Sequence, residues 1–105
     1  MTEREFLDLT DSVLNSLQTA LDSANLDLDY QLNGGVLEIE FDNGAKVIVN
    51  RHVPNQEIWV AAKSGGFHFA PDAEGRWISR REQAELQPLV TQLIIDGANG
   101  PFEWA

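Results

Sequence analysis

The stretch Leu-Asp-Leu-Asp-Tyr-Gln-Leu-Asn-Gly-Gly-Val-Leu-Glu-Ile-Glu-Phe-Asp, residues 26–42, decides the fold. Apolar side chains alternate with acidic or polar ones on both sides of Gly34-Gly35, which is typical of strands with one buried face. Two such runs joined by two residues of this type predict a tight β-hairpin. The sheet that begins here is therefore expected to be antiparallel.

The register of this hairpin follows from its turn. With Gly34-Gly35 as the two-residue loop, Leu32 faces Leu37, and the apolar side chains of both strands lie on the core face. The same register places polar side chains opposite one another on the other face, in the pairs Gln31–Glu38, Asp29–Glu40 and Asp27–Asp42. Carboxylates are therefore expected to meet directly across the two strands.

An amphipathic helix is predicted over residues 3–23, before the hairpin. Thr2 and Glu5 have the spacing of a capping box at its start. Apolar residues recur every three or four positions and predict a buried stripe of Phe6, Leu9, Val13, Leu17, Ala20, Leu21 and Ala24, widened by Leu7 and Leu14. Asp8, Asp11 and Asp22 lie on the opposite, exposed face.

Further strands and a second helix are predicted after the hairpin, with Phe102 and Trp104 covering an edge of the core. The strands are expected around residues 46–52, 57–63, 67–69 and 76–78. The second helix begins between residues 83 and 87, holds Pro88 in its first turn, and ends at Asp96 before Gly97, its core residues being Leu86, Leu89, Leu93 and Ile94. Two helices flanking about six antiparallel strands predict an α+β two-layer sandwich, with both helices on one face of the sheet. Residues 1–105 are expected to form one domain.

Alternation along the predicted strands places Asn50, His52 and Trp59 on the uncovered sheet face. An exposed tryptophan among polar residues often marks a contact surface. Cross-strand packing of Trp59 against Ile48 is the alternative. We expect Trp59 to matter more for partner binding than for stability.

The acidic residues are concentrated in the first two-fifths of the chain. Residues 1–42 hold ten carboxylates against one cation, Arg4, in a chain whose net charge is −10. A charge distribution of this kind attracts cations or a basic protein surface. Nucleic acid is not an expected partner at a pI near 4.3, because phosphate contacts require lysine and arginine.

The absence of cysteine excludes disulfides, thiolate catalysis and cysteine-bound metal clusters, and it suits a reducing compartment such as the cytoplasm. No apolar run approaches the length of a membrane span, and the acidic N-terminus does not resemble a signal peptide. His52 and His68 are the only imidazoles, and no carboxylate–histidine–serine set is placed by the sequence. We therefore expect no enzyme active site.

Several of these segments together resemble the frataxin family, and in particular its bacterial members. The match lies in Asn33-Gly34-Gly35-Val36-Leu37, Phe41-Asp42-Asn43-Gly44, Val49-Asn50-Arg51, Pro54, Glu57-Ile58-Trp59, Ala62-Lys63 and Gly65-Gly66-Phe67-His68-Phe69, in the expected order. The resemblance implies a two-layer sandwich and weak binding of iron by surface carboxylates. It also implies interaction with a cysteine desulfurase and an iron–sulfur scaffold protein during cluster assembly.

Carboxylates are hard oxygen ligands that suit Fe²⁺, Fe³⁺ and other divalent cations, and an open acidic surface predicts weak binding. The predicted metal ligands are Asp8, Asp11, Asp22, Asp27, Asp29, Glu38, Glu40 and Asp42. The predicted partner contacts are Asp22, Asp27, Asp29, Asn50, His52 and Trp59.

We therefore expect an iron-binding accessory protein of iron–sulfur cluster assembly that regulates the desulfurase or supplies iron to it. Two alternatives stay open. One is an acidic regulator of the desulfurase with incidental metal affinity, and the other is an iron-storing or iron-oxidising assembly. A monomer is expected, and iron-driven oligomers stay open as well.

Overall fold

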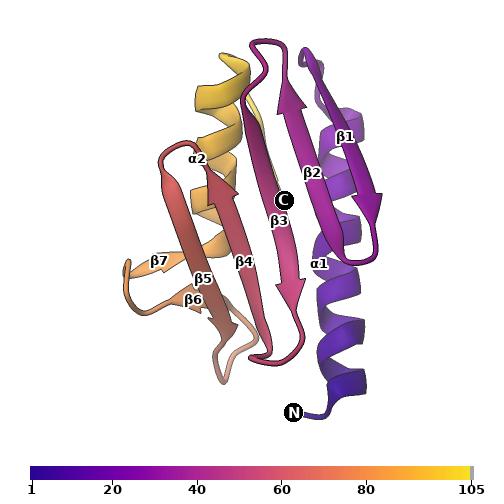
Figure 1. The fold of residues 1–105 in the computed structure, drawn as a ribbon, viewed down its shortest axis with the longest axis vertical. Coiled ribbons are helices and arrows are strands. Elements are labelled where there is room, and N and C mark those ends of the chain that lie inside the picture. Colours follow the sequence, from indigo (N-terminus) through magenta and orange to yellow (C-terminus); the bar gives the residue numbers. More distant parts are fainter. Residues whose placement is uncertain (105) are drawn as a thin grey trace.

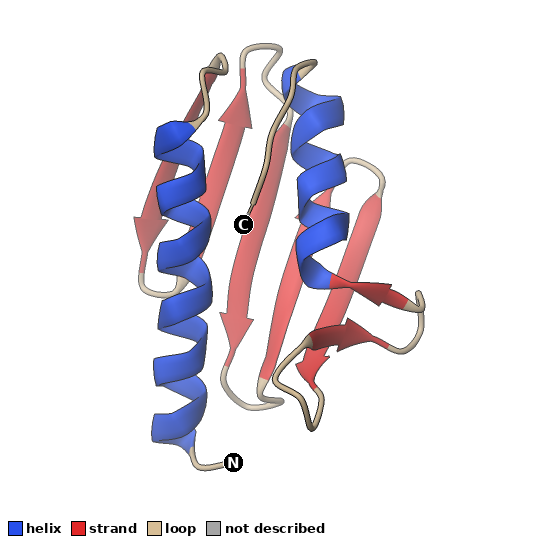
Figure 2. Cartoon of the chain, turned by 180° about the vertical axis from the view of Figure 1, so that it is seen from behind, coloured by secondary structure: helices blue, strands red, loops and turns tan. Residues whose placement is uncertain are grey.

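The computed structural model describes residues 1–104 and consists of two layers, a seven-stranded antiparallel sheet and two helices that cover one of its faces (Figures 1 and 2). Each strand pairs with the next one in the sequence, so that the strand order is β1-β2-β3-β4-β5-β6-β7. The helices are α1 Glu3–Ser23 and α2 Leu86–Ala98, and the strands are β1 Leu28–Asn33, β2 Val36–Phe41, β3 Lys46–His52, β4 Glu57–Ala62, β5 Gly65–Pro71, β6 Trp77–Ser79 and β7 Ala84–Glu85.

This architecture confirms the predicted α+β sandwich, and the strand beyond the predicted six is the two-residue β7. A short strand of this kind leaves no alternation to detect in the sequence. Within residues 1–104, no helix is both long enough and apolar enough to cross a membrane.

The β1–β2 hairpin has the predicted register, with Leu32 opposite Leu37 and Asp29 opposite Glu40. Gly34 and Gly35 have φ angles of 56° and 81°, and a two-residue hairpin loop of this type requires positive φ at both central positions. Loop length and turn chemistry therefore fix the pairing of the whole hairpin, including its acidic pair.

Helix α1 begins with the predicted capping box, in which the Glu5 backbone N–H donates to Thr2 Oγ1 at 3.1 Å and the Thr2 N–H donates to Glu5 Oε1 at 2.9 Å. The predicted stripe was wrong at Leu9, whose exposed fraction is 44%. Thr10 takes the core position instead and is fully buried, because its hydroxyl donates to the Phe6 carbonyl at 2.8 Å and so needs no water. The buried residues of α1 are Phe6, Thr10, Leu14, Leu17 and Leu21.

Helix α2 begins at Leu86, within the predicted range, and Pro88 lies in its first turn. Its fully buried side chains are Leu86, Val90 and Ile94, while Leu89 and Leu93, predicted to face the core, are only half-buried.

The predicted end of α2 was early, because Gly97 is inside the helix. The residue that ends the helix is Asn99, in the left-handed conformation at φ 55°. Gly97 has a different role: a Cβ at this position would overlap the buried ring of Phe41 on β2. Glycine therefore allows α2 to approach the sheet closely.

The chain after α2 runs back between the two helices on the covered side of the sheet (Figure 2). Phe102 and Trp104 are buried there, as predicted, and the Trp104 indole N–H donates to Ser16 Oγ of α1 at 2.9 Å. The helices and this tail leave the opposite sheet face uncovered, and the predicted site residues must be sought on that face and along α1.

Candidate functional site

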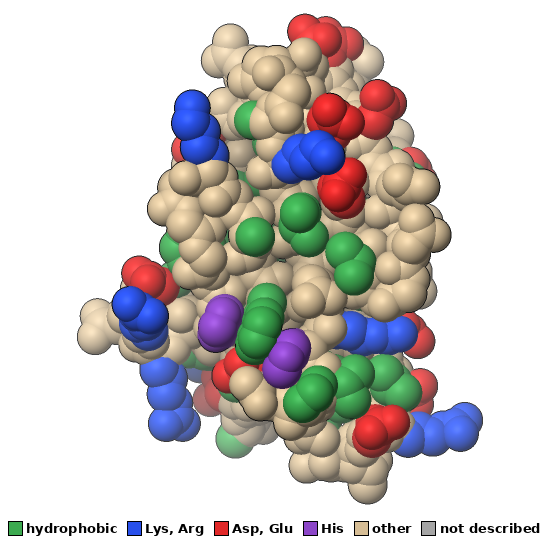
Figure 3. All heavy atoms as spheres, viewed as in Figure 1, with side chains coloured by type: hydrophobic (Ala, Val, Ile, Leu, Met, Phe, Trp, Pro, Cys, Tyr) green, Lys and Arg blue, Asp and Glu red, His purple; other side chains and the backbone are tan. Residues whose placement is uncertain are grey.

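Three aromatic rings are stacked on the uncovered sheet face, one from each of the neighbouring strands β3, β4 and β5. Trp59 lies between His52, at 3.7 Å between ring centroids and 8° between planes, and His68, at 4.3 Å and 9°. Figure 3 shows this arrangement as a hydrophobic side chain between the two histidines of the chain. We call His52, Trp59 and His68 the ring stack.

The register of the three strands explains the ring stack. Trp59 is directly opposite Asn50 on β3 and His68 on β5, and His52 is diagonal to it. Ile48, the alternative packing partner considered from the sequence, is opposite Ala61. The predicted contact residues Asn50, His52 and Trp59 are therefore brought together, and diagonal neighbours on one sheet face are within reach of aromatic rings.

The tryptophan of the ring stack is held in a defined orientation. Its indole N–H donates to Glu57 Oε1 at 2.8 Å, and the same oxygen is 4.0 Å from His68 Nδ1. His52 Nδ1 is buried and has no hydrogen-bond partner in the described part of the chain. The stack is thus ordered without a partner, which reduces the entropy lost when another protein binds it.

His68 and Glu57 were not predicted as site residues, although His68 is a member of the ring stack and Glu57 accepts the hydrogen bond of its indole. The sequence contained a signal for His68, because alternation along residues 67–69 places it on the same sheet face as Trp59. The two-residue turn Lys63-Ser64 sets the strand pairing that puts His68 opposite Trp59. Glu57 had no such signal, since its contact with the indole depends on side-chain conformation.

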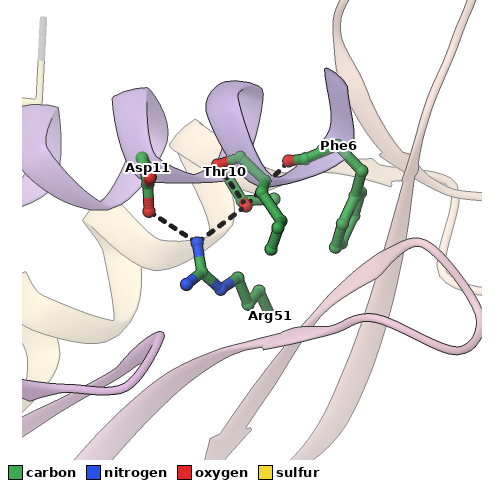
Figure 4. Close-up of polar contacts among 5 residues, drawn as sticks. Phe6, Thr10, Asp11 and Arg51 are labelled. Carbon is green, nitrogen blue, oxygen red and sulfur yellow. Dashed lines mark hydrogen bonds and ion pairs between the residues drawn. The ribbon is translucent and has the colours of Figure 1, made fainter. Parts of the chain in front are cut away.

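The predicted ligands on α1 are not gathered into a site. Asp11 forms an ion pair with Arg51 of β3, at 2.5 Å between Oδ1 and Nη1, and the same nitrogen is 3.4 Å from Thr10 Oγ1 (Figure 4). Asp22 accepts a hydrogen bond from the Tyr30 hydroxyl, which raises the pKa of Tyr30 above its ordinary value. Asp8 is exposed and has no ion-pair partner among residues 1–104.

The predicted acids of the β1–β2 hairpin do come together. Asp27, Asp29, Glu40 and Asp42, which we call the hairpin acid patch, line one open, polar concavity of about 420 Å³. Asp29 and Glu40 are direct cross-strand neighbours, and no lysine or arginine of the described residues forms an ion pair with any member of the patch. Figure 3 shows negatively charged side chains gathered at the upper right of the uncovered face.

Glu38, also a predicted ligand, differs from the patch because Lys46 Nζ is 3.4 Å from its Oε2. In the part of the chain that the structure describes, no three histidine or acidic side chains are close enough to hold a metal ion together. A cation at the hairpin acid patch would therefore keep most of its water, or would require side chains to move, and either requirement is expected to give weak binding.

Comparison with known proteins adds a consistent picture. A model of the frataxin-like domain family matches residues 1–99. The iron–sulfur cluster assembly protein CyaY of Chromobacterium violaceum is 49% identical over 105 residues, covering 100% of this chain and 99% of the relative. CyaY of Vibrio cholerae is 42% identical over 104 residues, covering 99% of each.

Solved structures agree with this similarity. A frataxin from Psychromonas ingrahamii superposes with a TM-score of 0.93 at 28% identity, over 100% of this chain and 99% of that one. A trimeric frataxin from the yeast Saccharomyces cerevisiae, in complex with ferrous iron, superposes with a TM-score of 0.68 at 26% identity, over 94% and 88% of the two chains.

Proposed function

The chain belongs to the frataxin family, and we propose from this membership that it is an accessory protein of iron–sulfur cluster assembly that acts in the cytoplasm. In this role it binds iron weakly as cargo and docks on the cysteine desulfurase and the scaffold protein of the pathway. The role is accessory rather than catalytic. Support comes from full-length relatives that are themselves iron–sulfur cluster assembly proteins and from the yeast frataxin in complex with ferrous iron.

The observation that carries the iron proposal is the cross-strand pair of Asp29 and Glu40 within the hairpin acid patch. Like charges directly opposite each other destabilise a sheet by roughly 0.2–1 kcal/mol. A cation that binds both carboxylates removes this repulsion, and hard oxygen ligands suit Fe²⁺ and Fe³⁺. An open site with few ligands also releases its metal readily, as an iron donor must.

The ring stack supports the partner proposal. It lies on the same uncovered sheet face as the outward-pointing side chains of Asp29 and Glu40, so one partner surface can contact both. Tryptophan that is already oriented is a favoured anchor at protein interfaces. A basic area of the partner would then lie over the hairpin acid patch.

The experiment that tests this function measures the affinity of the desulfurase–scaffold complex for the chain, with Fe²⁺ and with a chelator. D29K/E40K is expected to weaken binding about tenfold or more, because reversed charges then face a basic surface. The double variant E74K/E103K changes the net charge equally at exposed positions outside the patch and should bind within threefold of wild type. Equal losses for both variants would mean that only the total charge matters.

A second candidate, the metal-independent acidic regulator, is favoured by one specific observation. The described residues contain no group of three or more potential ligands close enough to hold a metal. Binding that is unchanged by the chelator but is lost in D29K/E40K would support the regulator. Binding that requires Fe²⁺ would support the iron-dependent role.

Replacing Glu40 by glutamine is expected to stabilise the metal-free protein by roughly 0.2–1 kcal/mol, because the repulsion from Asp29 is removed. The same change should reduce the rise in melting temperature that salt or millimolar Fe²⁺ gives to the wild type. Thermal unfolding followed by circular dichroism measures both effects. E103Q, an equal charge change on an exposed residue of the tail, is the control. A Glu40→Gln protein no more stable than this control would contradict the prediction.

A further inference from the structure

A second concavity lies beside the ring stack, where β5 and β6 meet the turn of residues 80–83. Its volume is about 370 Å³, which is within the range of small-ligand and peptide side-chain pockets. Ala70 and Ile78 form an apolar part of its lining, and His68 separates it from Trp59. We call it the β5–β6 cleft.

Two arginines of the β5–β6 cleft have no internal counterion. Arg80 and Arg81 both line the cleft and are exposed, and within residues 1–104 no carboxylate is at ion-pair distance from either guanidinium. The chain carries only seven lysines and arginines at a net charge of −10. In such a chain, two adjacent arginines without ion-pair partners are the groups of the cleft that can bind the carboxylate of another molecule.

The cleft also contains carboxylates, and their negative charge limits which anions can bind there. Asp72 accepts hydrogen bonds from the backbone N–H groups of Arg76 and Glu74 and from Arg76 Nε, which lower the pKa of Asp72 below its ordinary value. Glu57 is engaged by the indole of Trp59. These negative charges, together with Glu82, disfavour a multiply charged phosphate. A single carboxylate, by contrast, matches the arginine fork.

We propose that the β5–β6 cleft binds an acidic segment of the protein partner that docks on the ring stack. Arg80 and Arg81 hold a side-chain carboxylate of this segment. A neighbouring apolar side chain lies on Ile78 and against the free face of His68. The inference rests on the proposed function, because the partner is the one that contacts the ring stack and the hairpin acid patch.

The proposal gives the partner surface a defined charge pattern. A basic area faces the hairpin acid patch at one end of the sheet, and an acidic segment enters the β5–β6 cleft at the opposite edge. Complementary charges at two separated places fix the orientation of a complex and reject reversed docking.

The test compares R80E/R81E with R4E/K63E, which makes the same change in net charge at exposed cations outside the cleft. Affinity for the desulfurase–scaffold complex is measured by titration calorimetry at low and physiological salt. We expect R80E/R81E to weaken binding about tenfold or more, and R4E/K63E to weaken it less than threefold. Equal affinities of the two variants would overturn the inference while leaving the proposed function intact. Absence of binding by the wild type would instead refute the proposed function, and the inference with it.

A second measurement tests the cleft alone, by NMR of the ¹⁵N-labelled full chain. The probes are a capped Glu-Phe-Ala peptide, which carries one carboxylate, its Gln-Phe-Ala analogue and inorganic phosphate. We expect the acidic peptide to shift the amides of Gly66, His68 and Arg81, and R80E/R81E to abolish those shifts. Shifts of the same size with phosphate or with the neutral peptide would overturn the assignment to a carboxylate, as would no shift with any probe.

Discussion

Trp59→Ala is expected to reduce the affinity for the desulfurase–scaffold complex about 30-fold or more, which corresponds to the roughly 2 kcal/mol that marks an interface hot spot. The indole is the central ring of the ring stack, and its N–H is bound to Glu57, so its orientation does not have to be selected on binding. The same titration that tests the β5–β6 cleft measures the loss.

The stability cost of Trp59→Ala is larger than the sequence alone indicates. Two stacking contacts are lost, and each aromatic pair contributes about 0.5–1.5 kcal/mol beyond its buried area. We therefore expect a loss of about 2 kcal/mol, measured by urea unfolding.

The control for this prediction is Trp59→Phe, which keeps a ring between His52 and His68 but loses the hydrogen bond to Glu57. It should recover most of the stability and part of the affinity. Affinity of Trp59→Ala within threefold of wild type would contradict a role for Trp59 in binding. An unfolded Trp59→Ala protein would show that the ring stack is structural.

Gly97→Val is expected to destabilise the fold by about 3 kcal/mol, at the upper end of what extra atoms in a packed core cost. A Cβ at Gly97 would already overlap the ring of Phe41, which is only 4% exposed and cannot move into solvent. Valine adds two further carbons in the same place, so α2 would have to move away from β2. Denaturant unfolding measures the loss.

Gly66→Val is the matched control, because it makes the same side-chain change where the nearest atom to a new Cβ is 3.9 Å away. Gly66 has no positive φ and lies in a strand, which favours β-branched residues. Its stability should change by less than about 0.5 kcal/mol. A Gly97→Val protein as stable as this control would show that α2 can shift without cost.

The register of the hairpin was predictable, and the reason is local, although the predicted pair Asp27–Asp42 lies just beyond the paired strands, which end at Leu28 and Phe41. Gly34-Gly35 is a two-residue loop between Asn33 and Val36, and this loop length fixes every pair up to Asp29 and Glu40. The hairpin acid patch, which is part of the predicted acidic surface, followed from the same register. Whether those acids bind iron remains a prediction for the experiments above.

Other features depend on contacts that periodicity does not encode. Thr10 was not predicted as a core residue because its side chain is polar. The hydrogen bond from its hydroxyl to the Phe6 carbonyl nevertheless allows it to be buried. Asp11 looked like a free ligand because its partner Arg51 is 40 residues away in the sequence. The ring stack requires three strands in register and one particular rotamer for each ring. Alternation in the sequence placed Trp59 on the correct face, but it could not show that two imidazoles enclose the indole.

The strand order has a consequence for how fast the chain folds. Every strand pairs with its successor in the sequence, so each pairing closes a short loop and loses little chain entropy. Proteins dominated by such local pairings fold faster than those with distant strands side by side. Side-chain hydrogen bonds between remote segments include Arg51 with Asp11 and the Trp104 indole with Ser16, which is 88 residues away. We expect the pairs of neighbouring antiparallel strands to form first. The docking of α1 and of the C-terminal tail on the sheet then completes folding.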